Sequence, residues 1–442
     1  MNMLAKNAFI YLDKQDKPAL VYDKYNAKLY EIPYDMAKAA LAQNEQAIQI
    51  INQKLAPIPI KNPNKDNTIL AHLRLLITNK CNLKCIYCYA DEGTYHASSL
   101  TNMTIETAKH AIDMFFGIYR KIKQISFFGG EPLINLDVIE FVCGYISEKF
   151  ANEEIEEMPM FSMVTNATLL DNHALKLVLK HNITLVASID GECLIHDLQR
   201  PYKDDSGSFN DVHKNMCEYR KHAPFSVEAT YTSNHEKHGI SRLELVEYFK
   251  NQYDINRINI TNVSSSMNDS TDYLRPTSIN PVKAELEQFF DTEDNLIYTD
   301  LMIRLLANYA IDNYIPSFCD AGLSQFSVFV DGKIYPCHIF CGQDSKVLGS
   351  VHNNIDFSQL NSMFINKSNE KCDDCGNRRF CQFCLVDIEQ VLDSNSHCES
   401  LAITVDTLLY NIIHLRSTDN DKYQKLFSDM ETYKEFQKVS NE

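Results

Sequence analysis

The stretch HLRLLITNKCNLKCIYCYA, residues His72 to Ala90, decides the fold class of this 442-residue chain. Its first seven residues have the mainly apolar character of a buried strand. Three cysteines, Cys81, Cys85 and Cys88, follow soon after that strand ends. Parallel α/β folds place their chemistry just past the carboxyl ends of their strands. The stretch therefore predicts an α/β protein with a thiol site at the end of its first large strand.

Five further strand-like segments follow, and amphipathic stretches separate them. The segments read QISFFGG, FSMVTN, TLVASID, SVEATYT and INRINIT. Six β-then-α units predict a parallel sheet with right-handed crossovers. Because six units are too few to close an eight-stranded barrel, we expect a partial (β/α)6 TIM-like barrel.

Composition changes along the chain predict four parts. Short strands in AFIYLD and ALVYDKYNAKLYEI, then a helix near Met36 to Leu55, predict a small N-terminal α+β module over residues 1–65. The Pro- and Asn-rich linker APIPIKNPNKDN follows it. We expect the barrel over residues 66–312, a cysteine-rich domain over 313–400 and a helical tail over 401–442.

The charge of the chain limits its partners. A net charge of -17 argues against nucleic acid, because phosphate binding needs clustered Lys and Arg. Residues 1–65 hold nine Lys, no Arg and six acids, which fits either an acidic partner or a solvated Lys-rich face. The apolar runs are too short to span a membrane, and the N-terminus becomes charged too early for a signal peptide. We therefore expect a cytoplasmic protein with no membrane partner.

Fourteen cysteines are more than packing requires in a cytoplasmic chain, so they indicate metal or redox chemistry. Eight lie between Cys319 and Cys398, whereas the scattered Cys143, Cys193 and Cys217 are expected to be small buried hydrophobes. The three at 81–88 lack a fourth. Zinc with His96 as the fourth ligand is one reading. A four-iron cluster with one iron left free is the other.

The segment CNLKCIYCYA resembles the CxxxCxxC signature of the radical S-adenosylmethionine (SAM) superfamily, including the aromatic Tyr87. Four more segments resemble motifs of that family, at the ends of successive strands: FFGGEP, TNATLL, SIDG and HDLQRP. The resemblance implies that the three cysteines bind a 4Fe-4S cluster. It also implies a set of SAM-contacting residues: Tyr87, Gly129, Gly130, Glu131, Thr165, Asn166, Ser188, Asp190 and Arg200. Ala167 departs from the pattern, since the family usually has Gly there.

The later cysteines resemble the SPASM extension, which carries two auxiliary 4Fe-4S clusters. The resemblance assigns Cys372, Cys375, Cys381 and Cys398 to one cluster, and Cys319, Cys337 and Cys384 to the other. The spacing before Cys384 is two residues rather than the usual three, and no cysteine closely precedes Cys319. Because no cysteine closely precedes Cys319, the resemblance implies that the cluster of Cys319, Cys337 and Cys384 has an open iron or is closed by Cys341. A zinc ribbon built from the two CxxC pairs is the alternative.

These resemblances imply a peptide maturase with three 4Fe-4S clusters. Reductive SAM cleavage would yield a 5'-deoxyadenosyl radical that takes a hydrogen from a side chain of a ribosomally made precursor peptide. The product would be a cross-link or another two-electron oxidation. A one-electron donor such as flavodoxin or ferredoxin is implied. No catalytic base can be chosen among the many Tyr and His.

The N-terminal module resembles the leader-binding element of such maturases, which can add a leader as a strand to a sheet edge. A vestigial or merely structural hairpin is the alternative. Two other functions remain open. One is an anaerobic sulfatase-maturing enzyme that generates formylglycine. The other is a non-enzymatic iron-sulfur protein that transfers electrons or scaffolds a partner.

Overall fold

The computed structural model describes residues 8–55, 68–255, 258–263, 274, 281–291, 300–310, 321–360, 375–381 and 395–428. The chain divides into two compact units. The barrel unit comprises residues 65–277 and 320–366, and the terminal unit comprises residues 1–64, 278–319 and 367–440. Neither unit is a single continuous stretch of chain.

In the described part of the barrel unit, nine strands form one sheet in the order β12-β11-β10-β4-β5-β6-β7-β8-β9. The strands from β10 to β9 are parallel to one another. The six predicted strands are confirmed, and they lie side by side in chain order. They are β4 Ile69–Thr78, β5 Lys121–Gly129, β6 Met160–Thr165, β7 Thr184–Ser188, β8 Ser226–Tyr231 and β9 Ile258–Asn262. The predicted α/β class with a parallel sheet is therefore correct.

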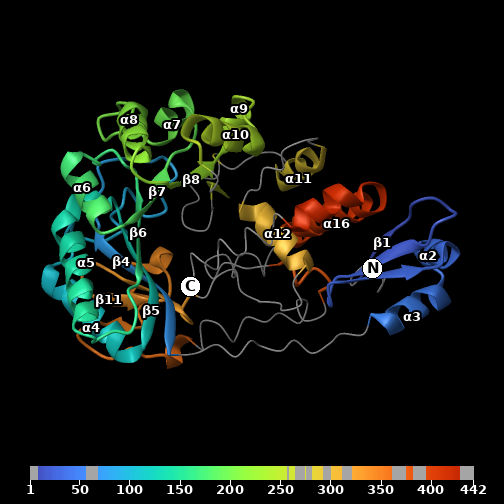
Figure 1. The fold of residues 1–442 in the computed structure, drawn as a ribbon, viewed down its shortest axis with the longest axis horizontal. Helices are drawn as coiled ribbons and strands as arrows, with labels where there is room; N and C mark the ends of the chain where they lie inside the picture. Colours follow the sequence, from blue (N-terminus) through green and yellow to red (C-terminus); the bar gives the residue numbers. More distant parts are fainter. Residues whose placement is uncertain are drawn as a thin grey trace. The chain divides into compact units, whose positions relative to one another are not determined.

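Helices between these strands lie along one face of the sheet (Figure 1). They are α4 Ile105–Ile118, the short 3-10 helix η1 Pro132–Asn135, α5 Leu136–Ala151, α6 Asn172–Lys180, α7 Cys193–Gln199, α8 Phe209–Arg220, α9 Ser233–Lys237 and α10 Arg242–Tyr253. Side-chain caps start several of them. Asp171 accepts from two backbone N–H groups at the start of α6, and Ser241 and Glu244 form a capping box on α10.

Three strands at one edge of the sheet come from a segment that the sequence analysis placed in the cysteine-rich domain. They are β10 Gln325–Val328, β11 Lys333–Tyr335 and β12 Gly349–Ser350. β10 runs parallel to β4, and β11 and β12 continue the sheet antiparallel. Two short 3-10 helices, η3 His338–Phe340 and η4 Asp344–Lys346, lie between β11 and β12. The barrel sheet therefore extends beyond the six predicted strands.

The terminal unit contains a three-stranded antiparallel sheet, with β1 Ala8–Tyr11, β2 Ala19–Asp23 and β3 Lys28–Ile32. The single helix expected near Met36 to Leu55 is instead two helices, α2 Tyr34–Leu41 and α3 Glu45–Lys54. Gln43 lies between them with φ +72°, and the Asn44 side chain caps α3. The first helix ends here because a residue with left-handed backbone angles cannot continue a right-handed helix.

Three longer helices complete the described part of the terminal unit: α11 Pro281–Asp291, α12 Asp300–Ala310 and α16 Asn395–Thr418. The Tyr22 ring of β2 stacks on Tyr309 of α12 at 4.8 Å, and its hydroxyl donates to the Tyr309 carbonyl at 2.9 Å. Buried Lys24 donates to Asp406 of α16 at 2.7 Å. These contacts join the N-terminal sheet to helices far along the chain. No helix in the described ranges is long and apolar enough to cross a membrane.

Candidate active site

The cysteine loop, residues 79–101, begins where β4 ends. Asn79 is buried and ties the two ends of this loop together, because its side chain donates to the Ser99 carbonyl at 2.8 Å and accepts from the Thr101 N–H at 2.6 Å. In the middle of the cysteine loop, the Lys84 N–H donates to the carbonyl of Pro201, in the segment after α7, at 3.0 Å. The three thiols therefore sit on a loop that is anchored at its base and along its length.

Gly129 and Gly130, at the end of β5, run against the backbone of the cysteine loop. A Cβ on Gly129 would lie 2.2 Å from the Thr78 carbonyl oxygen, and one on Gly130 would lie 2.3 Å from the Lys80 carbonyl oxygen. Gly129 also has φ +147°. Both positions need glycine because the protein's own backbone approaches them so closely. The SAM contacts predicted for the two glycines stay predictions.

Glu131 is fully buried, and uncharged donors hold its carboxylate. It accepts from the Thr165 hydroxyl at 2.7 Å, from Asn166 N–H at 2.7 Å and from Leu133 N–H at 3.0 Å. Desolvation raises the pKa of Glu131 to about 7, although these three hydrogen bonds act in the opposite direction. This carboxyl therefore joins the ends of β5 and β6, and it titrates near neutral pH.

The turn after β6 brings Asn166 to the cysteine loop. Its side-chain amide donates to the Asn82 oxygen at 3.0 Å and lies 3.9 Å from the Cys81 sulfur. Ala167 follows with φ +59° and is buried. Alanine therefore occupies the left-handed conformation for which glycine is the usual residue. The turn keeps its shape despite the departure noted in the sequence.

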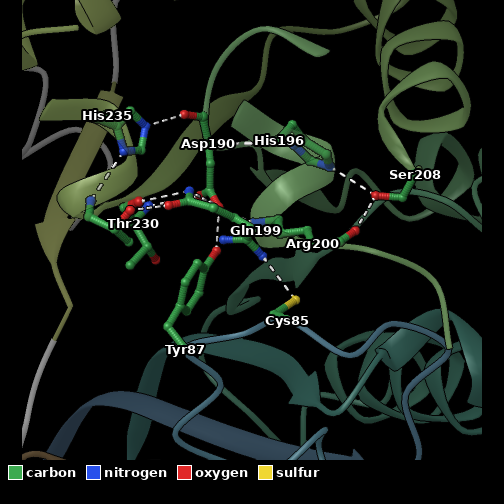
Figure 2. A network of polar contacts seen from close by, with 10 residues as sticks. Cys85, Tyr87, Asp190, His196, Gln199, Arg200, Ser208, Thr230 and His235 are labelled. Atoms are coloured by element: carbon green, nitrogen blue, oxygen red, sulfur yellow. Dashed lines mark hydrogen bonds and ion pairs between the residues drawn. The ribbon is translucent and has the colours of Figure 1, made fainter. Parts of the chain in front are cut away.

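Asp190, which follows β7, is the centre of a buried polar network (Figure 2). One carboxylate oxygen accepts from the Tyr87 hydroxyl at 2.5 Å, from Gln199 Nε2 at 2.9 Å and from Arg200 Nε at 2.9 Å. The other accepts from Thr230 N–H at 2.9 Å. Desolvation by itself raises the pKa of Asp190, but the charge and hydrogen bonds of its neighbours, Arg200 foremost, outweigh it and the net shift is downward.

Arg200 connects Asp190 to the cysteine loop. Its guanidinium lies over the Tyr87 ring, 5.3 Å from the ring centroid, and its Nη1 lies 4.0 Å from the Cys85 sulfur. The SAM contacts predicted for Tyr87, Asp190 and Arg200 stay predictions. What the structure shows is that the three side chains hold one another beside Cys85 (Figure 2). Ser188 lies at the end of β7, paired with Glu228 of β8, and its predicted contact also stays a prediction.

Two histidines and a serine extend this network, and the sequence analysis missed all three. His235 hydrogen-bonds the Asp190 carbonyl at 2.7 Å. His196 contacts the Asp190 N–H at 3.4 Å and Ser208 at 3.1 Å, and Ser208 donates to the Arg200 carbonyl at 2.6 Å. His196 stands in the quoted HDLQRP segment, so its position beside Arg200 was a signal. His235 lies far along the chain and carried none.

The three thiols are partly exposed, yet burial raises the pKa of Cys81 and Cys85 to about 12 and raises that of Cys88 as well. Such thiols stay protonated at neutral pH unless positive charge compensates them. Asn166 and Arg200 already aim N–H groups at two of the sulfurs. Three thiols with nearby donors fit an iron-sulfur cluster, in which each thiolate binds a separate iron.

Residues 75–227 match the family model of the radical SAM superfamily. The match begins within β4, contains the cysteine loop and the Asp190 network, and ends in β8. This chain has a radical SAM domain. Such a domain binds SAM and a 4Fe-4S cluster.

Three curated proteins are similar to the chain in sequence. An uncharacterized protein of Methanocaldococcus jannaschii is 36% identical over 37% of this chain and 54% of its own length. The cysteine-type anaerobic sulfatase-maturating enzyme of Clostridium novyi is 24% identical over 61% of this chain and 74% of its own. The subtilosin biosynthesis protein AlbA of Bacillus subtilis is 22% identical over 78% and 71%. The chain thus spans about half the length of the first relative and about three quarters of the others.

Two solved structures share the fold of this chain. The structure of anSMEcpe with bound AdoMet has a TM-score of 0.65 at 22% identity, covering 79% of this chain and 99% of that one. Streptococcus suis SuiB bound to S-adenosylmethionine has a TM-score of 0.54 at 15% identity, covering 87% and 96%. The likeness confirms the predicted partial barrel of the radical SAM fold.

The cysteines assigned to auxiliary clusters are only partly within the described residues, and Cys319, Cys372 and Cys384 lie outside them. In the barrel unit, Cys337 and Cys341 are buried on either side of η3. In the terminal unit, Cys375 is half-buried, Cys381 is buried and Cys398 is exposed on α16. The helical tail expected from 401 thus begins before Cys398. The ligand sets of both auxiliary clusters stay predictions.

Proposed function

We propose that the chain is a radical SAM peptide maturase, in which Cys81, Cys85 and Cys88 hold the SAM-binding 4Fe-4S cluster. The observation that carries the proposal is the three-thiol loop anchored at the carboxyl end of β4, inside a radical SAM domain. When bound, the cluster and SAM supply a 5'-deoxyadenosyl radical that abstracts hydrogen from substrate. The work of the chain's own residues is to position these groups.

Each side of the cysteine loop has its own anchor. Gly129 and Gly130 let the end of β5 lie against the loop, where Glu131 joins it to β6. Asn166 donates toward Cys81, and Arg200 places its charge beside Cys85. An N–H group directed at a cluster sulfur raises the reduction potential of that cluster, since it stabilises the added negative charge. Asp190 orients Arg200 and Tyr87 for this role.

A peptide substrate is supported by two of the comparisons. AlbA takes part in the biosynthesis of the bacteriocin subtilosin, and SuiB has been solved with its precursor peptide SuiA, at a TM-score of 0.50 and 14% identity to this chain. The small antiparallel sheet of the terminal unit provides strand edges that an extended leader could extend. A one-electron donor of the flavodoxin or ferredoxin type completes the reaction.

The later cysteines would hold two auxiliary clusters. In this proposal, Cys375, Cys381 and Cys398 share one cluster with Cys372. Cys337 belongs to the other, with Cys319 and Cys384. Cys341 is buried like Cys337 and directly follows η3, so it is available as a further ligand of the cluster that includes Cys337.

The test is anaerobic reconstitution with iron and sulfide, followed by assays for 5'-deoxyadenosine and for peptide modification by mass spectrometry. The peptide tested is the product of any short open reading frame that lies beside the gene. Cys85→Ala should abolish SAM cleavage, whereas Cys375→Ala should retain most SAM cleavage and lose the peptide product. The expectation that Cys193 is buried was wrong, because it is exposed at the start of α7. Cys193→Ala is therefore the matched control and should behave as wild type. Wild-type activity of the Cys85 variant would defeat the proposal.

Sulfatase maturation is the second candidate, because anSMEcpe has the higher TM-score of the two structures. The same assay with a cysteine-containing sulfatase peptide separates the two. Formation of formylglycine would favour this candidate. Modification of the neighbouring precursor alone would favour the first.

A further inference from the structure

The inner face of the barrel sheet carries a row of polar side chains. Ser327 of β10, Arg74 of β4, Ser126 of β5 and Ser162 of β6 are register partners across adjacent parallel strands, so they share one face. The neighbouring positions on these strands are apolar and face the helices, as the contact of Phe326 with Phe115 of α4 shows at 5.9 Å. The polar row therefore faces away from the helices, into the barrel.

Arg74 is the charged member of this row, and no carboxylate among the described residues pairs with it. It is half-buried, and it takes part in no hydrogen bond or ion pair with any other described residue. By contrast, Arg200 and Arg242, the buried arginines of the same unit, donate to Asp190 and to the Ile260 carbonyl. A guanidinium inside a barrel normally pairs with a carboxylate or phosphate.

Among the described residues around Arg74, His72 adds no second positive charge. Burial lowers the pKa of His72 well below its usual value, and the charge of Arg74 lowers it further, so His72 is neutral at pH 7. His72 hydrogen-bonds Ser126, which shares a hydrogen bond with Ser162 at 2.7 Å. His72, Ser126 and Ser162 therefore hydrogen-bond among themselves, and none of them hydrogen-bonds Arg74.

Ser327 supplies an independent sign of a missing partner. It is 0% exposed, and its Oγ has no hydrogen-bond partner among the described residues. It stands directly across from Arg74 in the β10–β4 register. A buried hydroxyl without a partner is unfavourable, so such groups usually meet a ligand or water.

We infer that Arg74 and Ser327 form a carboxylate-binding site inside the barrel, which receives an acidic side chain or the C-terminal carboxylate of the peptide substrate. The inference rests on the proposed function, since it gives that substrate a contact in the barrel. Arg74 lies four residues before the end of β4, so the site is about 13 Å along the strand from the cysteine loop. A bound carboxylate there holds the peptide in the barrel while another side chain faces the radical.

The experiment measures binding of three five-residue peptides to the reconstituted, SAM-bound protein by equilibrium dialysis. The first peptide has an internal Asp and an amidated end, the second has Asn and a free terminal carboxylate, and the third has Asn and an amidated end. We expect the first or the second to bind about tenfold tighter than the third. Which of them does so identifies the source of the carboxylate. The net charge of -17 works against this preference, so general attraction cannot produce it.

Arg74→Gln should remove the preference, and Arg74→Lys should keep part of it. Arg120→Gln is the matched control, because Arg120 is exposed and pairs with Glu156 on the surface of the same unit at 2.5 Å. Ser327→Ala removes only a hydroxyl, so it tests the site even where Arg74→Gln folds poorly. It should reduce the preference severalfold.

Equal binding of all three peptides to wild type would overturn the inference. So would a preference that survives both Arg74→Gln and Ser327→Ala, or an Arg74→Gln variant that loses iron but keeps the preference. SAM cleavage is measured in parallel. Its absence from wild type would defeat the proposed function, whereas intact cleavage without any carboxylate preference would defeat this inference alone.

Discussion

Glu131 after β5 and Asp190 after β7 are both fully buried, and both contact segments that hold the cysteine loop. Asp190 receives a guanidinium together with uncharged donors, and its pKa falls. Glu131 receives only uncharged donors, and its pKa rises to about 7. Similar burial thus accompanies pKa shifts in opposite directions. At Asp190 the contacting cation outweighs desolvation, whereas at Glu131 three hydrogen bonds from uncharged donors do not.

Asp190→Asn removes the carboxylate charge that pairs with Arg200, and it should have the largest effect on the free energy of unfolding. Arg200 would then be buried without its counter-charge, which typically costs about 3–5 kcal/mol. Urea unfolding of the iron-free protein measures the loss. Asp254→Asn is the control, since Asp254 pairs with Arg220 while 90% exposed, and it should change stability little. Equal, small losses in both variants would show that the Asp190 pair is not a buried anchor.

Arg200→Gln should make Asp190 resemble Glu131. Without the cation, desolvation raises the pKa of Asp190 above its unfolded value near 4, so stability is lost as the pH rises through the raised pKa. We therefore expect the contribution of Asp190 to the stability of the variant, unlike that of wild type, to be lost as the pH rises above about 4. If the free energy of unfolding of both proteins changed in parallel with pH, hydrogen bonds alone would account for the lowered pKa of Asp190.

Glu131→Gln tests the raised pKa of the carboxyl that only uncharged donors contact. In wild type the folded pKa of about 7 exceeds the unfolded value, so this group's contribution is full below about pH 4.5 and is lost as the pH rises toward 7. The loss is about 3 kcal/mol. The glutamine variant lacks this component, so the stability difference between wild type and variant should decrease across that window. A constant difference would contradict the raised pKa.

Ala167→Gly should have the smallest effect, and in the stabilising direction. Relief of the left-handed strain, less the greater freedom of glycine in the unfolded chain, should give about 0.5 kcal/mol. Ala111→Gly, in the buried interior of α4, is the control and should destabilise by about 1 kcal/mol. Thermal unfolding compares the two. A destabilised Ala167→Gly would show that the turn selects alanine for its methyl contacts.

The sequence predicted the six central strands because each has a local pattern, an apolar run followed by an amphipathic helix. It could not predict β10, whose four residues pair with β4 some 250 positions earlier, because such pairing leaves no local trace. It also missed the split between α2 and α3, where Asn44 was a visible N-cap but no Gly or Pro marked the break. In the site, motif spacing located Glu131, Asp190 and Arg200. Their contacts depend on partners from separate segments, and only the fold shows them.

The position of β10 beside β4 has a consequence for how the protein is made. The ribosome delivers β4 through β9 first, then residues 278–319 of the other unit, and only afterwards β10. Until residue 328 emerges, one flank of β4 presents unpaired backbone groups, which invite pairing with another chain. A fragment ending at residue 312 would keep that flank permanently, so expression of the six-stranded region alone should give aggregates, and fragments reaching past β12 should stay in solution.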